Sequence, residues 1–91
     1  MAQMYELQAR YDSRQSFYGK AQVQVNADGS KYLYSYGTLV AIRRPDGLMD
    51  INGVWSQTTS RHQREFMRQE GFQVPSPLRS GIYTEDGKQV R

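Results

Sequence analysis

The sequence predicts an α+β fold in which a small antiparallel β-meander of about five strands packs against one C-terminal helix. Three observations predict it. Apolar and polar residues alternate along most of the chain up to Trp55, short turn sequences separate the alternating segments, and a single later segment has the spacing and end signals of a helix. Because short turns join neighbouring strands in an antiparallel arrangement, the strands are expected to follow one another through the sheet in chain order.

The alternation divides into five predicted strands, which are residues 4–11, 18–25, 31–36, 38–44 and 48–55. The second is the most regular, with Ala21 and Val23 on one side and Gln22 and Gln24 on the other. In the fourth, Val40 and Ile42 are expected to oppose Leu39, Ala41 and Arg43. The turns carry Asp28-Gly29, Gly37 and Pro45-Asp46-Gly47, and Asn52-Gly53 predicts a bulge or tight turn in the fifth strand.

The helix is predicted over residues 59–70. Ser60 and Gln63 match a capping box, which sets the start near Thr59. Gly71 can adopt the left-handed conformation that ends a helix, and Phe72 is then placed to pack back on Met67. A narrow apolar stripe centred on Phe66 is expected to dock the helix on the sheet.

A second stripe on the same helix contains Arg61, Arg64 and Arg68 at i, i+3 and i+7. One interpretation is a solvated face with Glu65 and Glu70 as local partners. The other is a surface for phosphate groups or an acidic partner, with Lys20, Lys31, Arg43 and Arg44 as further cations. These arginines are therefore candidate binding residues.

The predicted third strand places Tyr32, Tyr34 and Tyr36 on one face. Their rings could form a platform on which bases stack, or they could shelter one side of a small sheet with the hydroxyls at the solvent edge. These tyrosines are the second set of candidate binding residues.

The composition excludes several classes of function. The chain of 91 residues has no cysteine and one histidine, which rules out disulfides and the usual zinc sites, and no cofactor or metal is expected. A net charge of +3 permits attraction to polyanions but is mild for a dedicated nucleic-acid protein, and it argues against a mimic of DNA. No apolar stretch approaches the roughly 20 residues that span a bilayer. We expect a soluble protein in the cytoplasm of a host cell.

Catalytic motifs are not found. There is no nucleophile elbow, phosphate-binding loop or dinucleotide fingerprint. His62 could act as a general base with Asp50, Ser60 or Glu65, but a single histidine beside Phe66 more often bonds a strand carbonyl. The chain is therefore predicted not to be an enzyme.

Three segments together resemble a family of short uncharacterised proteins from bacteriophages and other mobile elements. They are YDSRQSFYGKA from Tyr11, LYSYGTLVA from Leu33, and TTSRH, EF and QEGF between Thr58 and Phe72. The resemblance implies a compact, strand-rich domain that ends in a helix, encoded by a mobile element. It implies no particular activity or ligand.

These observations predict one α+β domain over residues 1–73, followed by a proline-containing tail over 74–91 that is partly ordered at most. The predicted function is that of an accessory protein that binds a host protein, such as a component of an anti-phage defence system, or another phage protein. Inhibition of the bound host protein is one form that this function could take. The alternative is nucleic-acid binding through the basic helix stripe.

Overall fold

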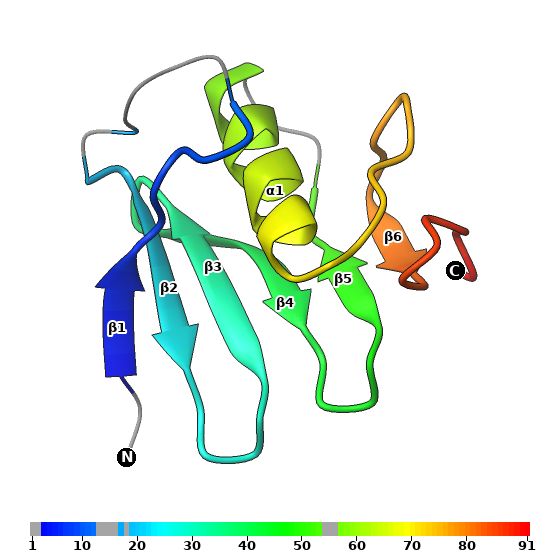
Figure 1. Cartoon of the computed structure of the whole chain (residues 1–91), viewed down its shortest axis with the longest axis horizontal. Helices are drawn as coiled ribbons and strands as arrows, with labels where there is room; N and C mark the ends of the chain where they lie inside the picture. The colour runs from blue at the N-terminus through cyan, green and yellow to red at the C-terminus, as the bar shows by residue number, and fades with distance from the viewer. Residues whose placement is uncertain (1–2, 13–16, 18, 54–56) are drawn as a thin grey trace.

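The computed structural model describes residues 3–12, 17, 19–53 and 57–91. In this part of the chain, strands in chain order form one antiparallel sheet, and one helix lies across one of its faces (Figure 1). The strands are β1 (Gln3–Glu6), β2 (Ala21–Val25), β3 (Lys31–Ser35), β4 (Thr38–Arg43), β5 (Met49–Ile51) and β6 (Gly81–Tyr83), and the helix is α1 (Gln57–Gln69). The predicted α+β meander with one helix is confirmed, and the described residues form a sheet of six strands where about five were predicted.

The hydrophobic core lies between α1 and the sheet. The helix packs mainly over β3 and β4, and it contributes Phe66 and Met67, both fully buried. Every second residue of the strands points toward the helix, because side chains alternate across a strand. The other buried apolar residues are Leu7, Phe17, Ala21, Val23, Leu33, Val40, Ala41, Met49, Ile51, Phe72 and Tyr83.

A β-bulge in β4 changes the predicted alternation. Leu33 pairs with Ala41 while Tyr34 pairs with Leu39, so Val40 is an extra residue opposite the third strand. Val40 and Ala41 are consequently both buried, where simple alternation predicted that they would face opposite ways. The carbonyl of Val40 accepts hydrogen bonds from the Asn52 amide at 3.0 Å and from the Gln63 side chain at 2.9 Å.

The C-terminal end of α1 agrees with its prediction, whereas the N-terminal end differs from it. At the C-terminal end, the Phe72 amide donates a hydrogen bond to the Met67 carbonyl, and the Gly71 amide donates one to the Arg68 carbonyl. Gly71 has a φ of +85°. This is the predicted Schellman end, and Phe72 is buried as expected. At the other end the helix begins at Gln57 rather than near Thr59, and the Gln63 side chain bonds β4 instead of closing a capping box.

The segment predicted as a tail contributes to the same sheet and core. β6 pairs with β5, and the buried Tyr83 donates its hydroxyl proton to the Arg79 carbonyl at 2.7 Å. A short strand is thus present in this segment, and the sheet extends beyond residue 73. The sequence did not indicate this clearly for two reasons. Proline and glycine are frequent in the segment, and a strand of three residues is too short to show a clear alternation.

Among the described residues, no helix has the length and apolar character needed to cross a membrane.

Candidate functional site

The two sets of candidate residues predicted from the sequence lie on different sides of the molecule. Arg61, Arg64 and Arg68 are on α1, whereas Tyr32 and Tyr34 point away from the helix, because Leu33 between them is buried against it. We call the sheet face opposite α1 the outer face. The arginines and tyrosines therefore do not form a single site.

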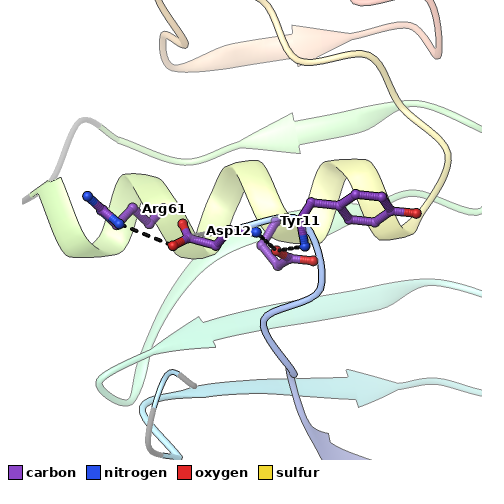
Figure 2. Close-up of polar contacts among 4 residues, drawn as sticks. Tyr11, Asp12 and Arg61 are labelled. Atoms are coloured by element: carbon purple, nitrogen blue, oxygen red, sulfur yellow. Dashed lines mark hydrogen bonds and ion pairs between the residues drawn. The ribbon is translucent and has the colours of Figure 1, made fainter. Parts of the chain in front are cut away.

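The arginine stripe does not act as three equivalent cations. Arg61 forms an ion pair with Asp12 at 3.1 Å (Figure 2), and the side chain of Asp12 is largely sheltered from solvent. Arg64 is partly exposed and Arg68 is exposed, and neither has a hydrogen-bond or ion-pair partner among the described residues. Glu70 was expected to be a local partner of these arginines, but it forms an ion pair with Lys31 at 3.0 Å instead.

Glu65 has a structural role that places Asp12 beside Arg61. Its Oε1 accepts hydrogen bonds from the main-chain amides of Tyr11 at 2.8 Å and Asp12 at 3.0 Å (Figure 2). Its Oε2 accepts one from the Gln69 side chain at 2.6 Å, and Gln69 also donates to the Gln8 carbonyl. The helix thus binds the segment that follows β1, and Arg61 and Glu65 are committed to that contact.

His62 lies in a buried polar cluster beneath the helix. Its Nδ1 is hydrogen-bonded to the Ser35 hydroxyl at 2.8 Å, and Ser35 is hydrogen-bonded to Thr59 at 3.0 Å. The prediction of a structural histidine named a strand carbonyl as its partner, and the observed partner is a strand hydroxyl. Burial lowers the pKa of His62, and the nearby charge of Asp12 opposes that shift. Ser35 and His62 are both almost completely buried, which fits the predicted structural role.

Tyr36 differs from the other two tyrosines in its backbone. It occupies the turn between β3 and β4 with φ +52°, followed by Gly37 at +81°. A two-residue turn with positive φ at both positions is the type I′ hairpin, which normally favours asparagine or glycine where Tyr36 stands. Tyr36 is 57 % exposed, and its ring lies 5.9 Å from the His62 ring, centroid to centroid.

The outer face carries an open hollow of about 590 Å³ that brings Tyr34 and Tyr36 together. Lys20, Gln22 and Gln24 from β2 and the residues before it also line it, with Met4 from β1. The side-chain amide nitrogen of Gln22 bonds the Gly19 carbonyl, and that of Gln24 bonds Asn26. The hollow thus combines two tyrosine rings, the Met4 thioether and two glutamine side-chain amides with the exposed cation of Lys20. We call it the β2–β3 hollow.

Strand register defines the rest of the outer face. Gln24, Tyr32, Ile42, Asp50 and Ile82 form one row across the sheet, and Glu6, Gln22, Tyr34 and Leu39 form another. All nine are partly exposed, and no described helix or strand covers them. The two carboxylates are at opposite sides of the tyrosines, so this face is not uniformly basic.

The sequence signalled part of this site. The alternation placed Gln22 and Gln24 opposite the buried Ala21 and Val23, and the structure confirms it. The sequence did not predict that Met4 and Glu6 of β1 lie beside these glutamines. Met4 pairs with Gln24, 20 positions away, and Glu6 pairs with Gln22, 16 positions away. Among the described residues, no cluster of three or more His, Asp or Glu side chains is placed to bind a metal ion.

Comparison with protein families identifies a match over residues 5–78 to a family of unknown function, DUF8033. The chain belongs to this family. The matched region begins in β1 and includes α1, whereas β6 lies beyond it. Comparisons with curated proteins and with solved structures give no match. The DUF8033 assignment agrees with the resemblance to an uncharacterised family and identifies no ligand.

Proposed function

We propose that this DUF8033 protein is a non-enzymatic binding protein whose partner is another protein, docked on the outer face of the sheet. The observation that carries the proposal is the β2–β3 hollow, where Tyr34 and Tyr36 lie beside Met4 and two glutamines on a face that no described helix or strand covers. Tyrosine and methionine are enriched at protein interfaces, because they bury much apolar area while the tyrosine hydroxyl still finds a polar partner.

The conformation of Tyr36 supports the proposal independently of the hollow. A non-glycine residue with positive φ costs on the order of 1 kcal/mol, and this one exposes a large ring to solvent. Asparagine or glycine would form the same turn with less strain, and Tyr36 is largely exposed although its ring lies 5.9 Å from the ring of His62. A ring that anchors a partner would account for both.

The resemblance to phage and mobile-element proteins suggests which kind of protein the partner is. The partner would then be a host protein, such as a component of an anti-phage defence system, that is inhibited when its own surface is covered by the outer face. Lys20 at the rim of the hollow favours a partner with a carboxylate near the contact.

The test separates binding from folding by using Tyr36→Asn and Tyr34→Ala, with Tyr11→Ala as a matched control. Tyr11 is 61 % exposed and lies on the segment bound by α1, so its loss removes a surface tyrosine elsewhere. We expect Tyr36→Asn to melt at or above the wild-type temperature. Affinity capture from host cells should then recover a protein with wild type and Tyr11→Ala and lose it with both hollow variants.

The purified partner should reproduce this pattern in a binding titration. A partner that binds all four proteins equally would show that another surface is used. Recovery of no protein, together with turnover of a small molecule by the pure chain, would contradict the proposal as a whole.

Nucleic acid is the second candidate, because Arg64 and Arg68 have no acidic partner among the described residues. It has less support, since Arg61 is paired with Asp12 and the tyrosines have Glu6 and Asp50 on their own face. Fluorescence anisotropy with mixed-sequence single-stranded RNA and DNA at two salt concentrations tests it. Salt-sensitive binding that disappears in Arg64→Gln/Arg68→Gln would favour this candidate.

A further inference from the structure

The two edges of the sheet are not equivalent. Residues 89–91 run alongside β6, and Tyr83 forms an antiparallel bridge with Gln89. The Val90 amide donates a hydrogen bond to the Ile82 carbonyl at 2.8 Å, and the Ile82 amide donates one to the Arg91 carbonyl at 3.1 Å. On the other side, β1 pairs with β2 only, and no described residue pairs with its outer edge (Figure 1). One edge is covered by the chain itself, and no described residue covers the other, which we call the open edge.

The open edge is short and carries one charge, Glu6, but it lacks the stronger features that prevent strands from pairing between molecules. β1 reads Gln-Met-Tyr-Glu, without proline, lysine or a described bulge. It also exposes apolar side chains on both faces of the sheet, since Met4 is 55 % exposed on the outer face and Tyr5 is 39 % exposed on the helix face. An added strand would cover both.

The hydrogen-bonding phase of β1 identifies the main-chain groups available at this edge. The Leu7 amide bonds the Ala21 carbonyl at 2.9 Å, and in an antiparallel ladder alternate residues bond the same neighbour. Gln3 and Tyr5 therefore direct their main-chain groups toward β2, whereas Met4 and Glu6 direct theirs outward. The pairing of β2 with β3 supports this independently. The Tyr36 amide donates a hydrogen bond to the Lys20 carbonyl, so the even-numbered residues of β2 direct their main-chain groups toward β3 and the odd-numbered ones toward β1.

We infer that β1 pairs antiparallel with β1 of a second copy of this chain, with Tyr5 facing Tyr5 of the partner across a two-fold axis. In this register Met4 lies opposite Glu6 of the partner, so every outward main-chain group of these two residues has a partner group. Opposite residues also share a face of the combined sheet, as a two-fold axis perpendicular to the sheet requires. No charge faces a like charge, and the two Tyr5 rings shelter each other.

The rest of the fold is compatible with this dimer. The helix covers β3 and β4, away from β1, so the two helices do not approach the axis. The β2–β3 hollow includes Met4, and pairing through β1 would place two hollows on one continuous outer face. The dimer does not depend on the proposed partner, but it would let the protein bind a symmetric or repeated target through both hollows.

Sedimentation velocity of the full chain over a concentration series is the first test. Wild type should show a concentration-dependent monomer–dimer equilibrium. Met4→Pro removes an amide that points outward and leaves the ladder with β2 intact, so it should raise the dissociation constant by roughly an order of magnitude or more without lowering the melting temperature appreciably. Met4→Ala, which keeps the amide, is the matched control and should dimerise more strongly than Met4→Pro.

A charge-swap experiment tests the register and does not depend on a proline. Tyr5→Glu and Tyr5→Lys each place like charges opposite one another at the two-fold axis, so each alone should be monomeric. Their equimolar mixture should form a heterodimer.

A wild-type chain that stays monomeric at several hundred micromolar overturns the inference. So does a dimer that is unaffected by Met4→Pro together with Tyr5 variants that do not discriminate between like and unlike partners. A monomer that binds an extended foreign peptide along β1 would assign the edge to another occupant. Because these readouts concern self-association alone, they are independent of partner capture through the hollow.

Discussion

The two faces of the sheet are built by the same strands but differ in how their apolar residues are used. Leu33 and Ala41 are fully buried under α1, whereas Tyr32 and Ile42, the next residues along the same strands, remain partly exposed on the outer face. Apolar area removed from water stabilises by about 25 cal/mol per Å². The helix face therefore supplies most of the stability, and the outer face keeps apolar and aromatic area that can still be buried by a partner.

The largest effect is expected for Phe66→Ala. This ring is fully buried between α1 and the sheet, so its loss should lower the free energy of unfolding by about 3 to 5 kcal/mol. Tyr32→Ala on the outer face is the comparison and should cost about 1 kcal/mol or less. Chemical denaturation measures both, and similar costs for the two variants would show that the faces do not differ as described.

Glu65→Gln is expected to have the next largest effect. The substitution keeps the size of the side chain but removes the charge that holds the Tyr11 and Asp12 amides, and it sets an amide donor against that of Gln69. We expect a loss of about 1 to 3 kcal/mol. Amide hydrogen exchange should become faster at Tyr11 and Asp12 in particular. Unchanged protection at these two amides would contradict the role of Glu65.

The pH dependence of stability tests the buried polar cluster. Burial lowers the pKa of His62 in the folded state, so the folded protein binds a proton less readily than the unfolded chain. Stability is then full above the ordinary histidine pKa of about 6.5 and falls as the pH drops below it toward the folded value. Urea denaturation from about pH 7.5 to 5 should show this decline. In His62→Gln it should be shallower, and an equal slope in both proteins would assign the decline to other groups.

The smallest effect is expected for the two arginines outside the packed layer. Arg64→Gln and Arg68→Gln remove no ion pair described in the structure, so each should change stability by about 0.5 kcal/mol or less. Arg61→Gln loses the contact with Asp12 and should cost somewhat more, up to about 1 kcal/mol. Thermal melts of the three variants make the comparison. Equal effects at all three positions would mean that the ion pair contributes nothing measurable.

Features that depend on neighbouring residues in the chain were predictable from the sequence. The alternation in β2, the hairpin turns and the Schellman end at Gly71 arise from backbone geometry and from contacts a few residues apart. The start of the helix was placed two residues late, because several consecutive hydroxyl residues can each cap a first turn and only the surrounding fold selects among them.

Features that join distant residues were decided by the tertiary structure. Arg61 meets Asp12 and Glu65 meets Tyr11 only because α1 lies over the segment that follows β1, and nothing local marks such partners. The bulge at Val40 depends on how β3 and β4 pair, and the β2–β3 hollow depends on β1 lying beside β2. By itself the sequence determined an antiparallel meander with one helix, since periodicity and turns are local properties. Only packing decided which polar residues are committed to the fold and which face is left open, since burial is a property of the whole chain.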